Sequence, residues 1–476
     1  MLRSGWVLAV AVVMPLAPLP AQQPFINELP AAGRPVDIAA TSARRARLMD
    51  RLGDAVVVIP AAHARNGEAY GDYPQDSDFR QHNTFFYFSM LESQDAWIVL
   101  SASTSGPDQE ILLLPPRNPA QERWTGVRIG PDTTAMRLTG FATVLPTMAA
   151  PAPGVRPMPN STLDSLLASL RARNVPFYIP IEGTTRYEAA LGRLRADTAN
   201  GLVVRNLRPV SDSMRLVKDD VEIAALRRAA LISAEAHADM MRAARPGMWE
   251  YEIEAVVEAG FRKRGADRVG YPSIVGSGFN ATTLHYDVNR RQTQAGELVV
   301  VDAAAEFAQY TADVTRTFPT SGRFTPRQRA IYDLVLGAQQ AAMDSTRPGI
   351  TIGRLSQIAN RYLREHSGDL CPVAPGETLR GDSTCARYMI HGLSHWIGMD
   401  VHDVGPYSVP LAPGMVFTIE PGIYIPAESL GVRIEDDILV TATGYENLSA
   451  AAPRAAADVE RLMQNAQRAA TNRSGR

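Results

Sequence analysis

The chain has 476 residues, of which 45% are apolar and 21% charged, as is typical of a globular protein with a sizeable core. On length alone we expect about three average domains or two large ones. The 48 basic and 50 acidic residues give a formal charge of −2. This balance argues against a nucleic-acid-binding surface spread over the whole molecule. Only two cysteines and eight histidines occur, and five of the histidines lie between positions 285 and 402.

The first 21 residues have the layout of a cleavable secretory signal. Arg3 gives a positive start, Trp6–Leu16 form an apolar run, and Ala21 precedes polar sequence. The run is too short to span a bilayer of roughly 30 Å. A buried N-terminal helix is the alternative, but the prolines in this segment disfavour it. We therefore expect an exported protein, periplasmic or secreted, without a stable membrane anchor.

From about 40 to 210 the sequence alternates between short apolar runs and stretches with helical periodicity. This alternation predicts an α/β unit. The Pro-rich stretch at 146–160 is typical of a surface loop. The expected strands lie at 55–60, 96–102 and 110–116, and the expected helices at 42–52 and 161–174.

A second region begins near 212 and contains what looks like an internal repeat. A helical stretch, Arg-Pro-Gly at 245–247 and a second helical stretch are echoed by helix, Arg-Pro-Gly at 347–349 and helix. Chance is the alternative explanation for a single matching tripeptide. If the repeat is real, we expect a duplicated helix pair with a site where the halves meet.

Five side chains in this region are candidate metal ligands: Asp302, Asp313, His395, Glu420 and Glu435. Each has an ordinary alternative when taken alone, as a strand end, a turn cap, or a histidine bonded to backbone. However, three of the carboxylates adjoin apolar runs, where an unpaired charge would cost several kcal/mol. A compensating cation is the simplest explanation for the group.

The ligand types also restrict the metal. Four carboxylates and one imidazole make an oxygen-rich site, which favours Mn²⁺ or a similar divalent ion, with Co²⁺ or Zn²⁺ as alternatives. Four carboxylates carry about the charge of two divalent cations. We therefore expect a two-metal centre with ions about 3.5–4 Å apart.

Five ordered motifs carry a resemblance to aminopeptidase P and prolidase, metallopeptidases of family M24. They are YPSIVGSG…LHY (271–286), VDAAAEFAQYTADVTRTFP (301–319), HGLSHWIGMDVHDVG (391–405), PGMVFTIEPGIY (413–424) and VRIEDD (432–437). More weakly, RQHNTFFYFSML (80–91) and ERWTGVRIG (122–130) resemble the N-terminal domain of aminopeptidase P.

The resemblance implies an α+β protein with two domains. The C-terminal one would be a catalytic domain of the pita-bread fold, as in creatinase and methionine aminopeptidase. An α/β creatinase-like domain would precede it. The expected boundaries are 1–21 for the signal, 22–211 and 212–460 for the two domains, and 461–476 for a polar tail.

The resemblance also implies roles for the candidate ligands. Asp302 and Asp313 would bind one metal, His395 and Glu420 the other, and Asp313 and Glu435 would bridge the two. A bridging water would attack the scissile carbonyl, and Glu420 would accept its proton and pass it to the leaving proline nitrogen.

Six further positions match substrate-facing residues of the family. His285 and His402 would stabilise the tetrahedral intermediate and orient the peptide. The proline side of the pocket would be lined by His391, Tyr424 and Arg433. Trp124 would offer an aromatic ring to a substrate pocket, sometimes across a subunit boundary, with ordinary core packing as the alternative.

Three departures from the family pattern bear on the pocket. Ala304 replaces a usual glycine, which is tolerable unless the backbone there needs positive φ. Phe279 replaces a usual glutamate, and Thr84 falls where an acidic residue is common. None of the three removes a ligand.

We therefore expect an Xaa-Pro aminopeptidase that acts on proline-containing peptides and assembles as a homo-oligomer, a dimer or tetramer. One alternative is an Xaa-Pro dipeptidase, or prolidase, with the same metal centre. A second is a non-catalytic peptide-binding pita-bread module. In an oxidising compartment Cys371 and Cys385 could form a disulfide worth about 3 kcal/mol, and two free buried thiols are the alternative.

Overall fold

The structure is a computed structural model. It describes Ile26, Leu29 and residues 36–62, 79–102, 109–148, 158, 160–181, 198, 201–371 and 384–474. The expected signal at 1–21 lies outside the described residues, and so does most of the Pro-rich loop at 146–160.

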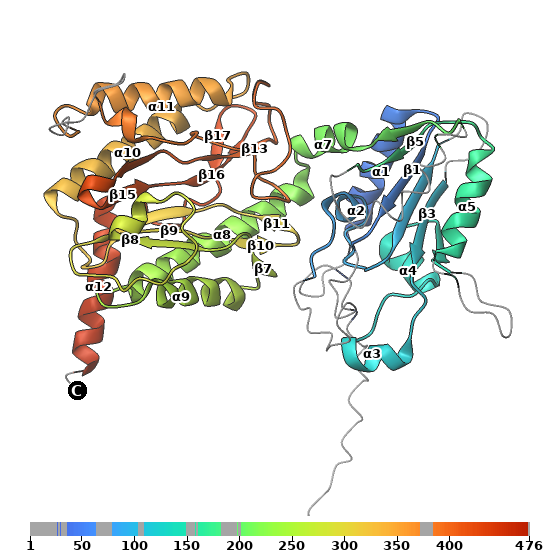
Figure 1. Ribbon diagram of the computed structural model, residues 1–476, viewed down its shortest axis with the longest axis horizontal. Coiled ribbons are helices and arrows are strands. Elements are labelled where there is room, and N and C mark those ends of the chain that lie inside the picture. The colour runs from blue at the N-terminus through green and yellow to red at the C-terminus, as the bar shows by residue number, and fades with distance from the viewer. Residues whose placement is uncertain are drawn as a thin grey trace, which may run out of the picture.

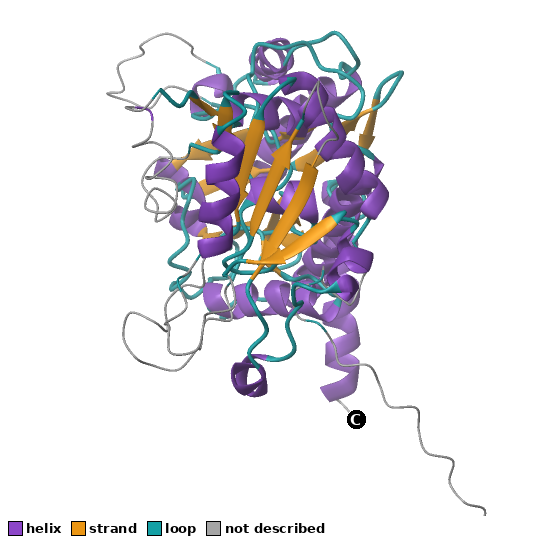
Figure 2. Ribbon diagram, turned by 90° about the vertical axis from the view of Figure 1, so that its right-hand side faces the viewer, coloured by secondary structure: helices purple, strands orange, loops and turns teal. Residues whose placement is uncertain are grey.

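The N-terminal domain is built around one six-stranded mixed sheet of order β4-β3-β2-β1-β5-β6 (Figures 1 and 2). Strands β1, β2 and β3 pair antiparallel, and the three outer pairings are parallel. The elements are α1 (Ile38–Leu52), β1 (Val56–Pro60), α2 (Asn83–Ser89), β2 (Trp97–Ser101), β3 (Gln109–Leu114), α3 (Pro119–Thr125), α4 (Thr133–Thr139), β4 (Thr143–Pro146), α5 (Ser161–Arg171), β5 (Phe177–Ile179) and β6 (Val204–Asn206).

Helices cover both faces of this sheet, and strand β1 shows why. Its side chains alternate between the faces. Val56 and Val58 belong to the buried cluster that includes the apolar side of α5, whereas Val57 and Ile59 belong to the cluster that includes α1 and α2. All five residues of β1 are buried, as its continuous apolar run predicts.

Helix α7 (Arg208–Leu216) joins the two domains (Figure 1). The boundary expected at 211/212 falls inside this helix. Arg44 of α1 donates from Nε to Asp219, at 2.8 Å, just beyond the end of α7. The linker is therefore tied to the N-terminal domain as well as to the C-terminal one.

The C-terminal domain combines small antiparallel sheets with long helices (Figure 1). The sheets have the orders β12-β9-β8, β13-β16-β17, β11-β10-β7 and β14-β15. The helices are α8 (Asp220–Ala243), α9 (Glu250–Lys263), α10 (Pro326–Asp344), α11 (Ile352–His366) and α12 (Ala456–Ser474), with 3-10 turns η3 (Gly278–Thr282), η4 (Cys385–Tyr388) and η5 (Pro426–Glu428). The strands are β7 (Arg268–Val269), β8 (Ile274–Ser277), β9 (Leu298–Asp302), β10 (Ala305–Phe307), β11 (Tyr310–Thr311), β12 (Thr315–Pro319), β13 (Val416–Ile419), β14 (Gly422–Ile425), β15 (Leu430–Arg433), β16 (Asp436–Val440) and β17 (Tyr445–Asn447).

The repeat predicted from the two Arg-Pro-Gly tripeptides is confirmed. The first joins α8 to α9 and the second joins α10 to α11. Gly247 and Gly349 both have φ of 89°, a conformation that favours glycine. Each half thus contains a helix pair whose connection has a glycine in the same conformation.

The C-terminal end of the chain is helical. Helix α12 runs across the boundary expected at 460, and Val459 and Met463 are both fully buried. The segment assigned above to a polar tail therefore begins inside a helix that packs on the domain. Within the part of the chain that the structure describes, no helix combines the length and apolar character that crossing a bilayer requires.

Cys371 and Cys385 are joined by a disulfide, with their Cα atoms 5.1 Å apart. The bond connects the segment that follows α11 to η4, six residues before His391. The predicted pairing is confirmed, and the alternative of two free thiols is wrong.

Candidate metal centre

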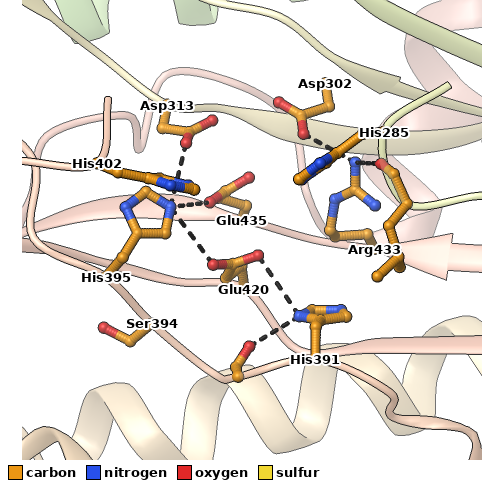
Figure 3. A pocket seen from close by; sticks show the side chains of 12 residues that line it. His285, Asp302, Asp313, His391, Ser394, His395, His402, Glu420, Arg433 and Glu435 are labelled. Atoms are coloured by element: carbon orange, nitrogen blue, oxygen red, sulfur yellow. Dashed lines mark hydrogen bonds and ion pairs between the residues drawn. The ribbon is translucent and has the colours of Figure 1, made fainter. Parts of the chain in front are cut away.

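A cavity of about 270 Å³ lies between the two halves of the C-terminal domain (Figure 3). Asp302 ends strand β9, and Asp313 precedes β12 in the first half. His395, Glu420 and Glu435 come from the second half, next to strands β13, β15 and β16. The antiparallel pairing of β9 with β12 places Asp302 opposite Thr315 and so brings the two aspartates close together.

The five predicted ligands all line this cavity, and three of them converge on His395 (Figure 3). The Nε2 atom of His395 lies 3.3 Å from Asp313 Oδ2, 3.5 Å from Glu420 Oε1 and 3.9 Å from Glu435 Oε1. Asp313, His395 and Glu435 each offer a ligand atom within 4.8 Å of the other two. The site predicted where the repeats meet is therefore present.

The cluster fits divalent cations. Glu435 Oε1 is buried and has no hydrogen-bond partner among the described residues. A buried carboxylate oxygen without a partner is costly, and a cation would satisfy it. Because the donors are four carboxylates and one imidazole, the set suits a hard or borderline divalent metal.

The pKa values of the clustered carboxylates and of His395 also indicate a site for cations. Burial raises the pKa of Glu420 to about 7, an effect that His395 opposes and Asp313 reinforces. Burial, followed by Asp313 and Glu420, raises the pKa of Glu435 well above its ordinary value. Burial lowers the pKa of His395, but its contact with Asp313 outweighs this and raises it to about 9. The protein alone cannot keep every carboxylate ionised near neutral pH, whereas bound cations would.

One wall of the cavity is a chain of polar contacts. Arg433 donates to Asp302 Oδ2 at 2.8 Å and to the Tyr424 hydroxyl at 3.0 Å. His391 Nε2 lies 2.8 Å from the same hydroxyl. Burial, then Arg433, lowers the pKa of His391 to about 4, so its ring is neutral at pH 7. Of the three residues predicted for the proline side of the pocket, His391 and Arg433 line the cavity beside Glu420, whereas Tyr424 is buried and bonds both of them without lining it.

The two histidines predicted to face substrate also line the cavity. His285 and His402 are exposed at its mouth. The ring of His402 lies 4.2 Å, centroid to centroid, from that of His395, a predicted ligand. Burial, then His395, lowers the pKa of His402, which favours its neutral form.

Trp124 lies elsewhere. It sits on α3, is 76% exposed and does not line the cavity. The alternative of ordinary core packing is therefore wrong. A contribution of Trp124 to the pocket of another subunit stays a prediction.

Two residues at the centre were missing from the predicted site. The Tyr271 hydroxyl lies 2.5 Å from both Asp302 Oδ1 and Asp313 Oδ1, and the Thr315 hydroxyl donates to Glu435 Oε2 at 2.6 Å. Both lie inside quoted motifs, but a hydroxyl next to an apolar run gives no sequence signal of its own. They hold the carboxylates in place.

The departures from the family pattern are accommodated. Ala304 is not among the described non-glycine residues with positive φ, so alanine is tolerated there. Phe279 is 57% exposed, on η3, and Thr84 is buried in α2.

Comparison with known proteins gives two family matches. Residues 224–442 match the model for metallopeptidase family M24, and residues 41–152 match the model for the aminopeptidase P N-terminal domain. The chain is 34% identical to an Xaa-Pro aminopeptidase of Escherichia coli over 451 residues, which cover 88% of this chain and 96% of that protein.

Solved structures of aminopeptidase P are also similar to this chain. Aminopeptidase P from E. coli with the inhibitor Pro-Leu superposes with a TM-score of 0.79 at 32% identity, covering 91% of this chain and all of that one. A zinc-substituted form of the E. coli enzyme in complex with product gives a TM-score of 0.77, covering 91% of this chain and 99% of that one, at 32% identity. The similarity therefore spans both domains, including the sheet of the N-terminal one.

Proposed function

The chain belongs to the aminopeptidase P family of M24 metallopeptidases, and on that premise we propose that it releases the N-terminal residue from peptides with proline in second position. The observation that carries the proposal is the convergence of Asp302, Asp313, His395, Glu420 and Glu435 on one cavity. All five ligands are present, which argues against a non-catalytic binding module.

Two divalent cations would be held by these five residues. Asp302 and Asp313 would bind one, His395 and Glu420 the other, and Asp313 and Glu435 would serve both. Bound there, the metals would polarise the scissile carbonyl and supply a nucleophile at neutral pH. We propose Mn²⁺ as the native metal, because the donor set is rich in oxygen.

Glu420 is the residue best placed to move the proton. A carboxylate that lies beside both the attacking water and the leaving nitrogen can accept a proton from the first and return it to the second. In the proposed reaction Glu420 takes a proton from the attacking water and delivers it to the proline nitrogen as the bond breaks. His391 Nδ1, 3.7 Å from Glu420 Oε2, lies on the side where that nitrogen would sit.

Specificity for proline follows from the polar wall. An Xaa-Pro bond has no N–H, so a site need not accept a hydrogen bond from it. The neutral ring of His391 lines the cavity and offers a face to the pyrrolidine, and the buried ring of Tyr424 packs against His391 at 5.5 Å between centroids. The Tyr424 hydroxyl bonds both Arg433 and His391 and so fixes the orientation of the His391 ring.

We further propose that the protein is exported and works as a homo-oligomer. Export is supported by the apolar N-terminal segment and by the Cys371–Cys385 disulfide, because disulfides persist in oxidising compartments. A mature chain that begins at Gln22, measured by intact mass after secretion, would bear this out. An intracellular protein retaining Met1 would contradict it.

The deciding experiment separates this activity from that of a prolidase. The mature protein is incubated with Mn²⁺ and either an Xaa-Pro dipeptide or the same dipeptide extended by three residues, with an Xaa-Ala peptide of equal length as the control. We expect mass spectrometry to show loss of the first residue from the extended Xaa-Pro peptide and not from the control. Cleavage of the dipeptide alone would contradict the proposal and indicate a prolidase.

A further inference from the structure

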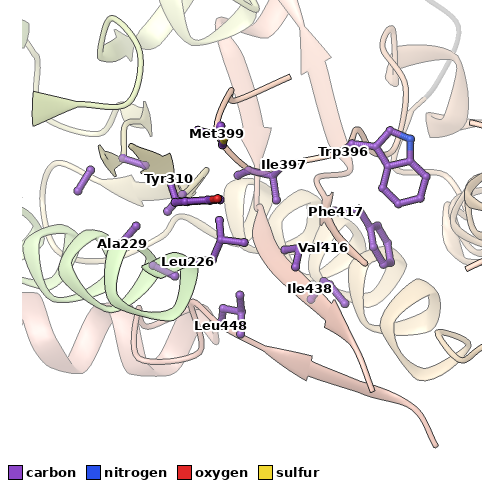
Figure 4. Close-up of a cluster of buried hydrophobic side chains, with 14 of the residues drawn as sticks. Leu226, Ala229, Tyr310, Trp396, Ile397, Met399, Val416, Phe417, Ile438 and Leu448 are labelled. Carbon is purple, nitrogen blue, oxygen red and sulfur yellow. The ribbon is translucent and has the colours of Figure 1, made fainter. Parts of the chain in front are cut away.

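His402 stands on a loop that has little regular structure of its own. Residues 398–405, which we call the histidine loop, contain no helix or strand, so no backbone ladder fixes them. The segment before the loop and the start of the loop itself are anchored in the core, where Trp396, Ile397 and Met399 are buried with Tyr310 (Figure 4). The remainder, including His402, is held by a backbone hydrogen bond from Asp403 to Trp396 and by side-chain contacts.

Asp403, the next residue after His402, is the first of these anchors. Its side chain is 1% exposed, and its two oxygens bond Arg215 Nη2 and Lys218 Nζ, the latter at 3.3 Å. Burial opposes ionisation of Asp403, but Arg215 and Lys218 keep its pKa below the ordinary value. Asp403 does not line the cavity.

The fit around Asp403 is tight. A Cβ added to Gly398 would lie 2.1 Å from Asp403 Oδ2, so only glycine lets the carboxylate occupy this position. The backbone N–H of Asp403 donates to the Trp396 carbonyl at 2.9 Å, which closes the loop on itself. Lys218 N–H donates to the Gly414 carbonyl at 2.9 Å and so fixes the linker against the same domain.

The other end of the histidine loop is held by the N-terminal domain. Asn83 of α2 donates to Asp400 Oδ2 at 2.6 Å, and Arg80 Nη1 lies 3.6 Å from Asp400 Oδ1. Arg80 also donates to the Met399 carbonyl. Arg215 Nη2 lies 3.6 Å from Asp400 as well. The histidine loop is thus held in place by side chains of the N-terminal domain and by the linker between the domains.

We propose that Asp403 is a positioning residue that, through Arg215 and Lys218 of the interdomain linker, fixes His402 at the mouth of the metal centre. Asn83 and Arg80 complete the grip from the N-terminal domain. This inference rests on the proposed function, because His402 acts only if the chain cleaves peptides. Burying the charges of Asp403, Arg215 and Lys218 costs free energy, and these three groups fix the loop that carries the substrate-facing histidine.

A double-mutant cycle tests whether Asp403 acts through His402. We expect Asp403→Asn to lower kcat at least tenfold, with KM changed less than threefold and with two metals still bound per chain. In a His402→Ala background the same change should have less than a twofold effect, since no histidine is left to position. Equal losses in both backgrounds would overturn the proposal.

A second variant and a structure keep the test decisive if Asp403→Asn folds poorly. Asn83→Ala removes the contact with Asp400 together with the bonds that Asn83 Oδ1 accepts from Arg80 and Gln309, and we expect a threefold or larger loss in kcat. In a crystal structure of the metal-loaded Asn83→Ala or Asp403→Asn protein, the separation of the His395 and His402 rings should exceed the 4.2 Å seen here. An unchanged ring position together with reduced kcat would contradict the proposal.

Asp219→Asn is the matched control. It makes the same carboxylate-to-amide change at an aspartate paired with an arginine, Arg44, beside the same linker, but Asp219 bonds to no residue of the histidine loop. Its kcat should equal that of the wild type. An equal loss in Asp219→Asn would show a general effect of loosening the linker. A wild-type protein inactive on Xaa-Pro peptides would overturn the proposed function itself.

Discussion

At the scale of single residues, Glu420 carries the most specific claim. It lies 3.5 Å from His395 and is one of the five predicted ligands, and it is also the proposed proton carrier. We expect Glu420→Gln to lower kcat by about 10³-fold or more, because general acid–base catalysis alone contributes about 10²–10⁴-fold. The measurement is release of the first residue from an Xaa-Pro peptide, with circular dichroism to confirm the fold.

Glu428→Gln is the control for this change. Glu428 lies on the surface, where it forms an exposed ion pair with Arg327, and exposed pairs contribute little. Its activity should match that of the wild type. Near-wild-type turnover in Glu420→Gln would refute the proton-transfer role.

The raised pKa values of Glu420, about 7, and His395, about 9, predict a pH dependence of metal binding. In protein stripped with EDTA, protons on these groups add stability below their unfolded pKa values. That stability is lost as pH rises through the folded values. Cations must displace the same protons.

Saturating Mn²⁺ should therefore raise the Tm of stripped protein more at pH 8 than at pH 6. Differential scanning fluorimetry at pH 6, 7 and 8, with and without metal, measures this gain. A gain that is equal or larger at pH 6 would contradict the linkage.

At the scale of elements, the Cys371–Cys385 bond ties the segment after α11 to η4, close to His391. A loop of this length contributes about 3 kcal/mol. Replacing both cysteines by serine should therefore lower Tm by roughly 6 °C. Reductant should lower the Tm of the wild type toward that of the variant and leave the variant unchanged. A wild-type Tm that stays unchanged after reductant has freed both thiols would show that the bond contributes nothing.

Elements rich in apolar residues were predictable from sequence. The runs at 55–60, 96–102 and 110–116 are strands, because three or more successive β-branched or aliphatic residues leave few alternatives. Their mutual direction was not predictable. Strands β1, β2 and β3 pair antiparallel, although strand–helix alternation suggests a parallel sheet.

The site was predictable where charge conflicts with burial. Asp302 and Glu435 could be predicted as site residues, because a carboxylate beside an apolar run is buried and needs a partner. Tyr271, which bonds both aspartates, and Asp403, which bonds the linker, gave no such signal. Their roles depend on pairings between segments distant in the chain, and only the fold brings those segments together.

At the scale of the whole molecule, the N-terminal domain contacts the C-terminal domain at the histidine loop and at strand β10. Arg80 and Glu306 form an ion pair between the domains at 2.7 Å, and Arg268 bonds both Glu306 and the Phe79 carbonyl. The N-terminal domain is thus attached near the mouth of the cavity. We expect the position of the N-terminal domain to set how many residues beyond the proline the cavity admits. This length distinguishes an aminopeptidase from a dipeptidase.

The central claim is that five ligands hold two cations that together cleave Xaa-Pro peptides. The most direct measurement titrates EDTA-stripped protein with Mn²⁺ while following release of the first residue from an Xaa-Pro peptide, with bound metal counted by mass spectrometry. The account predicts that activity reaches its plateau at two Mn²⁺ per chain, and that Glu435→Gln neither binds two ions nor cleaves. Full activity in the stripped protein, or in Glu435→Gln, would contradict it.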